Sequence, residues 1–413
     1  MSYVPRSLES KLQQHIQQFP VVLLTGARQA GKSTLLEHLF VSKDWTYVSL
    51  DRRKMIQSIN DDPDLFVEKI HSNIIIDEAH KTPGLFHAVK WHADQKMPYK
   101  IILSGSANFL LLSQITESLA GRAGVLELFP LGLAEIYRRP SLLSVLLAPH
   151  SADAVLNKLE QTQPLSEKQW LDHLFWGGFP KLREFKQSME KTNWFESYRT
   201  SYIERDVRDL AQIADLNDFQ KFHQLLAYQT GNILNISHTA NDTGINVLTC
   251  KKYLHILTAS YHYTLLYPYY ANVRKRLTKS PKVYILDTGL GNFLTRQDNI
   301  ESMESGGRWG DMVETMAITE MIKANSALPR KSQFYFWQTS NGAEIDLIID
   351  AGNRLVPVEV KTSSKVAKND IRAMIDFMAL GLPHPVPYGI VLYRGQDIYH
   401  ITDKVLAVPL GHL

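Results

Sequence analysis

A glycine-rich segment near the start of the chain has the residue types and spacing of a phosphate-binding loop. It fits the pattern G-x-x-x-x-G-K-S and stands between the apolar run Val21–Leu24 and a helical pattern. The glycines let backbone N–H groups turn toward phosphate oxygens, and the following helix adds a favourable dipole. We predict that Lys32 binds the β- and γ-phosphates of ATP and that Ser33 binds Mg²⁺. The residues expected to contact the nucleotide are Gly26, Ala27, Arg28, Gln29, Ala30, Gly31, Lys32, Ser33 and Thr34.

Two adjacent carboxylates follow a second apolar run, Asn73–Ile76. Asp77 is expected to hold Mg²⁺ through water, and Glu78 is expected to polarise the attacking water as the general base. The competing interpretation is a strand that stops in a solvated acidic turn. Because a phosphate-binding loop precedes this strand, we favour the catalytic interpretation. The acid pair then indicates hydrolysis of ATP rather than storage of the nucleotide.

Two further positions could complete the same site. Ser104 or Ser106, at the end of another strand pattern, is a candidate for orienting the lytic water, and a small-residue strand end is the competing interpretation. Arg122 is a candidate arginine finger, in cis or from a neighbouring subunit, and a surface arginine is the alternative. The sequence leaves both choices open.

Acidic residues and a lysine gather near the end of the chain. Asp346 lies in one apolar strand pattern, and Glu359 and Lys361 share one face of the next, because strand side chains alternate with a period of two. Residues 350–353 between the strands indicate a hairpin turn. We therefore expect Asp346 and Glu359 to meet and to hold a divalent cation, with Lys361 orienting or deprotonating a water. A helix that begins near Trp309 would supply Glu314 as a further carboxylate.

The competing interpretation of this C-terminal group is two amphipathic strands with a solvent-facing acid and a surface ion pair. The hairpin together with Glu314 favours a phosphodiesterase-like site, and whether such a site still cuts is left open. The candidate catalytic residues of the chain are Glu78, Lys32, Ser104, Arg122, Asp346, Glu359, Lys361 and Glu314. The candidate metal ligands are Ser33, Asp77, Asp346 and Glu359.

The elements that must position these residues change in type along the chain. Short apolar strands alternate with helical stretches over residues 1–135, which predicts a parallel sheet covered by helices. The strand patterns lie at Val21–Leu24, Tyr47–Leu50, Asn73–Ile76 and Lys100–Leu103. From about residue 140 to 215 the pattern is helical, with a turn at Gly177–Pro180, and residues 283–413 return to mixed helices and strands.

The middle of the chain has the pattern of a winged helix-turn-helix. Residues 235–260 predict two helices separated by a turn at Gly244, and Tyr261–Tyr270 is aromatic and strand-like. The second helix carries residue types suited to DNA groove or phosphate contacts, namely Asn246, Thr249, Lys251, Lys252 and His255. A basic group follows, formed by Arg274, Lys275, Arg276, Lys279 and Lys282. Contact with DNA and contact with protein alone stay equally open.

Length and composition bound the kind of protein. The chain has 413 residues, 44% of them hydrophobic and 21% charged, with a formal net charge of +3. This length is too great for one core of usual size, so we expect two to four domains. The single cysteine excludes a disulfide framework within one chain. No apolar run approaches the roughly 20 residues that span a bilayer, and the N-terminus lacks a signal-peptide pattern, so we expect a cytoplasmic protein without membrane contact.

With these motifs in place, the chain closely resembles a family of prokaryotic AAA-type ATPases fused to a C-terminal domain of unknown function. The resemblance runs nearly end to end and rests on Phe19–Gly26, Leu119–Gly124, Tyr202–Asp209, Lys279–Tyr284, Asp287–Leu290 and Pro357–Lys361. It implies an ATPase core, a winged helix and a restriction-endonuclease-like domain of the PD-(D/E)XK type. By that likeness the ATPase roles fall to Lys32, Ser33, Asp77 and Glu78, and the nuclease-like roles to Glu314, Asp346, Glu359 and Lys361. Gln338 stands where the likeness leads us to expect an arginine.

The predicted fold class is α/β, and the predicted domains follow the order of the sequence. They are a P-loop AAA-type ATPase core (1–140), a helical lid or linker (141–215), a winged helix (216–280) and a PD-(D/E)XK nuclease-like domain (281–413). The predicted function is binding and hydrolysis of ATP, with Mg²⁺, together with a DNA-directed, metal-dependent nuclease-like module. The alternative is a regulatory ATPase switch, or an ATP-dependent DNA-binding protein, whose nuclease-like domain is inactive. A second divalent metal, DNA as a partner and a homo-oligomer are further expectations that the sequence leaves open.

Overall fold

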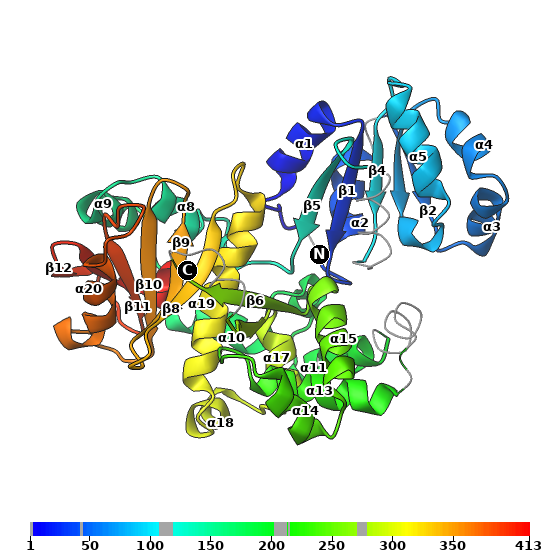
Figure 1. Ribbon diagram of the computed structural model, residues 1–413. Coiled ribbons are helices and arrows are strands. Elements are labelled where there is room, and N and C mark those ends of the chain that lie inside the picture. The colour runs from blue at the N-terminus through cyan, green and yellow to red at the C-terminus, as the bar shows by residue number, and fades with distance from the viewer. Residues whose placement is uncertain (1–2, 42–43, 107–118, 202–212, 214, 271–278) are drawn as a thin grey trace. The chain divides into compact units, whose positions relative to one another are not determined.

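The computed structural model describes residues 3–41, 44–106, 119–201, 213, 215–270 and 279–413 (Figure 1). These residues form two compact units, each built from separate stretches of sequence. The first unit contains Met1–Leu131, Phe179–Leu216 and Leu254–His262, and the second contains Gly132–Gly178, Asn217–Tyr253 and Tyr263–Leu413. Each unit therefore combines stretches that lie far apart in the sequence. The four-part division by sequence order stays a prediction.

A parallel five-stranded sheet forms the centre of the first unit. Its strands lie in the order β2-β3-β4-β1-β5, and every pairing between neighbours is parallel. The strands are β1 (Val21–Gly26), β2 (Trp45–Ser49), β3 (Asn73–Asp77), β4 (Ile101–Ser104) and β5 (Ala123–Leu128). The predicted parallel sheet and its four strand patterns are confirmed, and β5 adds an edge strand.

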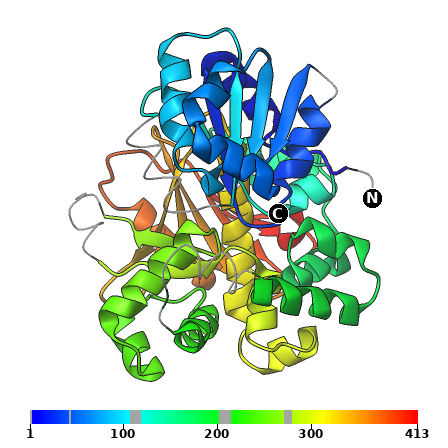
Figure 2. The ribbon, with the colours of Figure 1, turned by 90° about the vertical axis from the view of Figure 1, so that its right-hand side faces the viewer.

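Helices cover both faces of this sheet (Figure 2, blue and cyan). They are α1 (Glu9–Gln18), α2 (Lys32–Phe40), α3 (Arg53–Asp61), α4 (Pro63–Glu68) and α5 (Leu85–Asp94). Because strand side chains alternate, Val21 and Leu23 of β1 join the buried core that contains residues of α3, α4 and α5. Val22 and Leu24 join a separate core with residues of α1 and α2. An apolar strand buried on both faces is typical of a parallel sheet enclosed by helices.

A helical stretch from further along the chain completes the first unit. The 3-10 helix η2 (Pro180–Glu184) begins at the predicted turn and leads into α11 (Ser188–Ser201). The ring of Tyr198 lies 4.9 Å from that of Phe179 and 5.2 Å from that of Trp194, measured between centroids. These aromatic contacts hold the start of η2 against α11.

A mixed eight-stranded sheet forms the centre of the second unit, in the order β12-β13-β11-β10-β9-β8-β6-β7. The strands are β6 (Tyr263–Pro268), β7 (Lys282–Ile285), β8 (Gln333–Gln338), β9 (Glu344–Asp350), β10 (Leu355–Lys361), β11 (Gly389–Tyr393), β12 (Tyr399–Thr402) and β13 (Val405–Pro409). β9 and β10 are antiparallel, with Leu355 opposite Asp350 and Val358 opposite Leu347. The predicted hairpin at residues 350–353 is confirmed.

Helices pack on both faces of the larger sheet as well. α19 (Trp309–Ala327) places Met312 and Met316 in a core with one set of strand residues, and α20 (Arg372–Met378) places Phe377 in a core with the alternate set. Further helices are α7 (Leu133–Ile136), α8 (Leu142–Leu147), α9 (Ala152–Glu160), α10 (Glu167–Trp176), α13 (Leu216–Tyr228), α17 (Thr288–Leu294), α18 (Ile300–Ser305), η4 (Lys368–Ile371) and η5 (Leu410–His412). The sheet is thus the middle layer of its unit.

The two helices predicted in the middle of the chain are present as α14 (Ile236–Thr243) and α15 (Val247–Ala259). The Asn235 side chain accepts a hydrogen bond from the His238 N–H and so caps α14. Gly244 ends α14 with a φ of 72°, a left-handed conformation that favours glycine. The predicted helix, turn and helix are therefore confirmed, and capping residues set both ends of α14.

The strand pair that follows α15 belongs to the eight-stranded sheet. β6 is antiparallel to β7, with Leu266 opposite Lys282, and it is parallel to β8, with Tyr267 opposite Tyr335. The predicted boundary between residues 280 and 281 thus falls between two hydrogen-bonded strands. Strand pairing joins the two segments because β6 has partners on both edges.

A buried carboxylate ties α10, α19 and the start of α7 together within the second unit. Oε1 of Glu320 is 3.0 Å from His173 Nε2 and 2.8 Å from Lys323 Nζ, and Oε2 accepts a hydrogen bond from the Leu133 N–H at 2.6 Å. Burial by itself would raise the pKa of Glu320, but the neighbouring Lys323 and His173 lower it to about 2. The ionised carboxylate therefore stabilises this unit.

We predict that Glu320→Gln weakens the fold in a pH-dependent way. The folded-state pKa of Glu320 lies below its ordinary value of 4.5, so its contribution is complete above pH 4.5 and is lost as the pH falls toward 2. A shift of this size corresponds to about 3 kcal/mol. Urea unfolding should give a large difference between wild type and Glu320→Gln at about pH 6 and a much smaller one at about pH 3. An equal difference at both pH values would contradict this role.

Candidate functional site

The glycine-rich loop connects β1 to α2 as the sequence predicts. At Gly26, φ is 147°, and an added Cβ would lie 2.0 Å from the Leu128 carbonyl oxygen of β5, so only glycine fits. Gly31 precedes α2 with a φ of 97°. Lys32 Nζ donates hydrogen bonds to the carbonyl oxygens of Gly26 and Ala27, both at 2.9 Å. These contacts hold the ammonium group over the loop.

The Asp77 carboxylate, at the end of β3, gathers hydroxyl groups from three other elements. Ser33 of α2 and Tyr47 of β2 each donate to Oδ2 at 2.6 Å, and Ser104 of β4 donates to Oδ1. The Glu78 N–H also donates to Oδ1, at 3.1 Å. Burial would raise the pKa of Asp77, but the hydrogen bonds from Ser104, Ser33 and Tyr47 outweigh it and hold the pKa below its ordinary value. Asp77 is therefore an anion at neutral pH.

Glu78 adopts a left-handed backbone conformation with a φ of 58°, which is uncommon for a residue with a side chain. Burial, reinforced by the charge of Asp77, raises the pKa of Glu78. His80 Nδ1 lies 3.3 Å from Glu78 Oε2. Burial and the charge of Lys81 lower the pKa of His80 to about 4, so this histidine is neutral at pH 7. Glu78 is thus a carboxylate of raised basicity beside a neutral imidazole.

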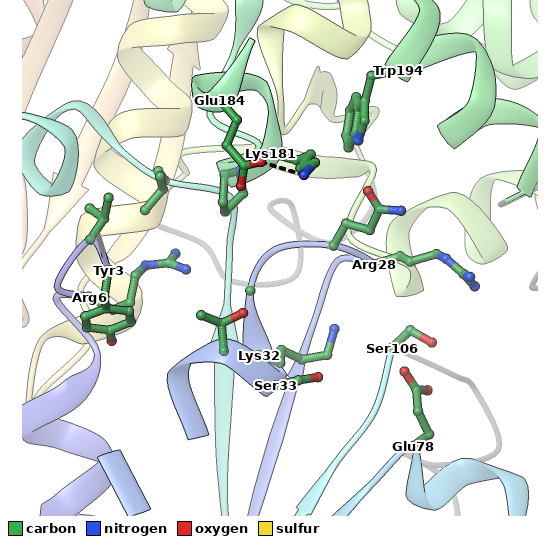
Figure 3. Close-up of a pocket in the computed structure, with 16 residues that line it drawn as sticks. Tyr3, Arg6, Arg28, Lys32, Ser33, Glu78, Ser106, Lys181, Glu184 and Trp194 are labelled. Carbon is green, nitrogen blue, oxygen red and sulfur yellow. Dashed lines mark hydrogen bonds and ion pairs between the residues drawn. The ribbon is translucent and has the colours of Figure 1, made fainter. Parts of the chain in front are cut away.

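A pocket of about 690 Å³ opens beside the loop, within the first unit (Figure 3). Figure 3 shows Lys32 and Ser33 at the start of α2, with Glu78 and Ser106 near each other on adjacent strand ends. The lining residues are Tyr3, Val4, Arg6, Arg28, Gln29, Gly31, Lys32, Ser33, Thr34, Glu78, Ser106, Leu131, Pro180, Lys181, Glu184 and Trp194. The volume and the mixed lining suit a nucleotide. Of the predicted loop residues, Gly26, Ala27 and Ala30 lie outside this lining.

The structure separates the two serine candidates. Ser104 is fully buried and its hydroxyl bonds to Asp77, whereas Ser106 lines the pocket. The Ser104 hydroxyl thus has Asp77 as its partner, and its assignment to the lytic water stays a prediction. Ser104 positions Asp77, because it is the last residue of β4 and the adjacent β3 ends at Asp77.

Arg122 lies at the opposite end of the strands from the phosphate-binding loop, so it does not reach this pocket in cis. It directly precedes β5, whose first residue pairs with Val21, whereas the loop lies at the other end, where Gly26 pairs with Leu128. β5 has six residues, about 20 Å of strand. Arg122 forms an ion pair with Asp94 and is absent from the pocket lining. This geometry does not favour the arginine-finger role in cis, and the arginine-finger role stays a prediction.

The residues near Asp77 fit a magnesium ion. Ser33 Oγ and the anionic Asp77 carboxylate are hard oxygen ligands, and both lie beside the loop that would hold the phosphates. Ser33 lines the pocket directly, which suits inner-sphere binding, and Asp77 is 5% exposed behind it, which suits binding through water. These two residues are the ones expected to hold Mg²⁺.

The predicted C-terminal acids also come close to one another, within the second unit. β9 and β10 pair as far as Leu347 opposite Val358, and Asp346 and Glu359 follow directly on the two strands. Asp346 Oδ2 accepts a hydrogen bond from the Val360 N–H at 2.7 Å. Burial raises the pKa of Asp346 well above its ordinary value, and the charges of Glu314 and Glu359 add to this. We call Glu314, Glu344, Asp346 and Glu359 the carboxylate cluster.

Lysine side chains neutralise the carboxylate cluster. Glu314 lies in α19, which begins at Trp309 as predicted, and its Oε1 lies 3.0 Å from Lys282 Nζ. Lys282 also forms an ion pair with Glu344. Burial opposes the charge on Lys282, but Glu314, Asp346 and Glu344 raise its pKa above the ordinary value. Lys361 Nζ lies 2.7 Å from Glu359 Oε1.

The expected second metal site is not supported. Among the residues that the structure describes, no group of three or more His, Cys, Asp or Glu side chains is arranged to hold a metal ion. The prediction for Asp346 and Glu359 placed them correctly side by side. It left out Lys282, which comes from a distant strand and brings its own positive charge into the cluster.

The sequence predicts neither Tyr47 nor two lining residues of the pocket as part of the site. Tyr47 is expected only as part of a strand, and its hydrogen bond to Asp77 depends on β2 being the neighbour of β3. Lys181 and Glu184 follow the predicted turn at Gly177–Pro180, and their placement depends on η2 folding against the first unit. Lys181, directly after this turn, is the one local signal that indicates them.

Tyr261 was also missed. Its hydroxyl lies 2.8 Å from Thr25 Oγ1, directly before the loop, and donates to Glu127 Oε1 at 3.3 Å. Two sets of predicted residues lie outside the described part of the chain. They are the basic residues Arg274, Lys275 and Arg276, and the whole segment Tyr202–Asp209.

Known families match three parts of the chain. Residues 18–137 match the family described as an AAA domain. Residues 167–301 and 309–413 match two families described as domains of unknown function, DUF8612 and DUF4143. The P-loop geometry and the AAA match agree on the same residues. The N-terminal part of the chain is therefore an AAA-type P-loop ATPase domain.

Individual proteins resemble the chain over most of its length. The uncharacterized protein Rv2008c of Mycobacterium tuberculosis is 27% identical over 412 residues, which are 99% of this chain and 84% of the relative. The uncharacterized protein MJ1544 of Methanocaldococcus jannaschii is 20% identical, over 86% of this chain and 77% of the relative. Among solved structures, the Walker-type ATPase paby2304 of Pyrococcus abyssi aligns with 71% of this chain and 96% of its own, at 16% identity and a TM-score of 0.47. Within the described residues, no helix is both long and apolar enough to cross a membrane.

We predict that Lys32→Ala strongly weakens nucleotide binding. Loss of a charge-assisted hydrogen bond costs about 1.5–3 kcal/mol, which is roughly a 10- to 100-fold loss of affinity for ATP. Titration with a fluorescent ATP analogue would measure it. Lys54→Ala is the matched control, because Lys54 is exposed on α3 and absent from the pocket lining. Equal affinity of Lys32→Ala and wild type would contradict the assignment.

Proposed function

We propose that this protein binds ATP with Mg²⁺ in the pocket of the first unit and hydrolyses it. The observation that carries the proposal is the Ser33 hydroxyl donating to Asp77 at 2.6 Å, with Glu78 next in the chain and lining the pocket. In P-loop enzymes such a pair holds Mg²⁺ beside the phosphates, and an adjacent acid activates water.

Binding would use the loop and its lysine. Lys32 Nζ lies over the loop, and a phosphate oxygen within its reach gains a charge-assisted hydrogen bond. The start of α2 adds N–H groups that point toward the same anion. Mg²⁺, when bound by Ser33 and Asp77, neutralises phosphate charge. Lys181 and Glu184 face the same pocket from η2 and form an ion pair with each other.

Hydrolysis would use Glu78 as the general base. Its raised pKa, caused by burial and the charge of Asp77, makes it a better proton acceptor than an exposed glutamate. Neutral His80, 3.3 Å away, can orient the carboxylate without neutralising it. Ser106 lines the pocket beside Glu78 and is the residue we assign to orienting the lytic water.

For the C-terminal part we favour the non-cutting alternative. In this proposal ATP turnover acts as a regulatory switch, and the nuclease-like site predicted from Glu314, Asp346, Glu359 and Lys361 does not cleave DNA. The supporting observation is that the acids already bond to lysines and backbone, and that no group of three or more His, Cys, Asp or Glu side chains among the described residues could hold a metal ion. ATP-driven cleavage is the rival, and it requires a divalent metal at these acids.

DNA binding is a second candidate role, favoured by the exposed face of α15. Asn246, Lys251, Lys252 and His255 are exposed along the end of the turn and the helix. The two consecutive lysines are suited to contacts with DNA phosphates, and such contacts would weaken as the salt concentration rises. A homo-oligomer is a further proposal, since Arg122 would need the pocket of a neighbouring protomer to act as an arginine finger.

We predict that Glu78→Gln slows ATP hydrolysis by roughly 10²- to 10⁴-fold, because general-base catalysis contributes about that factor. Affinity for ATP should change little, since Lys32 and the loop are intact. Phosphate release and nucleotide titration would measure the two effects separately. Glu37→Gln, an exposed residue on α2, is the matched control. Full turnover in Glu78→Gln would remove it from the mechanism.

We predict that the protein does not cleave DNA and that any DNA binding depends on α15. Wild type and Asp346→Ala would be incubated with single- and double-stranded DNA and Mg²⁺ or Mn²⁺, with and without ATP. Cleavage that disappears in Asp346→Ala would instead establish the nuclease.

Lys251→Ala/Lys252→Ala should lower DNA affinity. It should also reduce the slope of log affinity against log salt concentration by about 2, since each phosphate contact contributes about 1. Unchanged DNA binding in that double variant would remove α15 from the interface.

A further inference from the structure

The carboxylate cluster contains a buried lysine that no nuclease-type site requires. Lys282 lies in β7, in a strand paired with β6, and is only 4% exposed. Its Nζ lies 3.0 Å from Glu314 Oε1 and forms a second ion pair with Glu344. A buried ammonium between carboxylates from a helix and another strand occupies the kind of place in which a divalent cation binds to such acids.

The carboxylate oxygens have their own partners as well. Glu314 Oε1 accepts a second hydrogen bond from the Tyr284 hydroxyl at 2.6 Å, and Glu344 Oε2 accepts one from Gln338 Nε2 at 2.9 Å. Gln338 is the residue that departs from the expected arginine, and here its amide binds an acid of the cluster. Glu314 Oε1 and both carboxylate oxygens of Glu344 therefore already have partners within the protein.

The two strand-end acids are held in the same manner. Asp346 Oδ2 accepts from the Val360 N–H, and Glu359 Oε1 pairs with Lys361 at 2.7 Å. Lys361 is the lysine that a nuclease-type site would use, so Lys282 is a second and separate positive charge. A divalent metal entering here would meet the like charge of the buried Lys282 ammonium, which is unfavourable.

We propose that the Lys282 ammonium is the resident cation of the carboxylate cluster, in the place that a divalent metal would take, so that the cluster joins β7, α19 and β9 and binds no metal. This inference deepens the proposal that the C-terminal part does not cut DNA. It identifies the residue responsible for the loss of metal binding. It is independent of ATP hydrolysis in the first unit.

The proposal predicts that removing the charge of Lys282 creates a metal site. Methionine keeps the length of the side chain without its charge, and Lys282→Met should leave the acids free to bind about one Mn²⁺ per chain, as hard oxygen ligands do. Lys282→Arg keeps the charge and should bind none. Adding Asp346→Asn to Lys282→Met should abolish the new site.

The experiment is titration of the nucleotide-free full chain with Mn²⁺, followed by the electron paramagnetic resonance of free Mn²⁺. Wild type and Asp346→Asn should give the same curve, and Lys282→Met should bind Mn²⁺ at least about tenfold more tightly than either, a factor of ten being about 1.4 kcal/mol. Thermal melting and ATP hydrolysis would establish that each variant is folded.

A wild-type Mn²⁺ site that Asp346→Asn removes would overturn the inference, and this comparison does not depend on Lys282→Met being stable. A folded Lys282→Met that gains no Mn²⁺ site would overturn it as well. In either case normal ATP hydrolysis would leave the proposed ATPase function standing. Absence of ATP hydrolysis in wild type would instead contradict that function. The Mn²⁺ comparison would still test the role of Lys282, because it does not depend on ATP hydrolysis.

Discussion

Hydrogen bonding to the Asp77 carboxylate is the interaction on which the arrangement of the first unit's site depends. It accepts hydroxyl hydrogen bonds from α2, β2 and β4, through Ser33, Tyr47 and Ser104, while it ends β3 itself. A buried anion is costly unless it is fully hydrogen bonded, and here those bonds lower its pKa. Three strands and the loop helix are thereby fixed around one charged group. The position of the phosphate-binding loop relative to the sheet follows from this arrangement.

The fixed end of β3 in turn determines what Glu78 can do. The left-handed turn at Glu78 directs the chain away from the strand, and the residue lines the pocket together with Lys32. Burial raises its pKa, while neutral His80 beside it adds no charge. The site thus combines Asp77, whose lowered pKa suits it to bind a cation, with Glu78, whose raised pKa suits it to accept a proton. Two neighbouring carboxylates acquire different chemistry from their environments.

In the second unit, by contrast, the buried acids form ion pairs and hydrogen bonds within the protein. Glu320 is satisfied by Lys323, His173 and a backbone N–H, and the carboxylate cluster is satisfied largely by Lys282 and Lys361. In both places acids and bases neutralise each other inside the protein, where each pair holds elements together. In the first unit, by contrast, charged groups line a pocket of about 690 Å³. Chemistry on a bound substrate needs such open, charged groups, so the first unit is where we place it.

The sequence alone determined the features that depend on neighbouring residues. It predicted the P-loop, the strands β1 to β4, the caps at Asn235 and Gly244, and the hairpin that brings Asp346 to Glu359. These features are predictable because backbone geometry and strand period are local properties. Tertiary structure decided the rest. The strand order β2-β3-β4-β1-β5 placed Ser104 beside Asp77, and the parallel pairing of β5 with β1 put Arg122 at the opposite strand end from the loop. The pairing of β7 with β6 brought Lys282 among the acids. No local pattern carries that information, since it depends on which distant segments become neighbours when the apolar faces are buried.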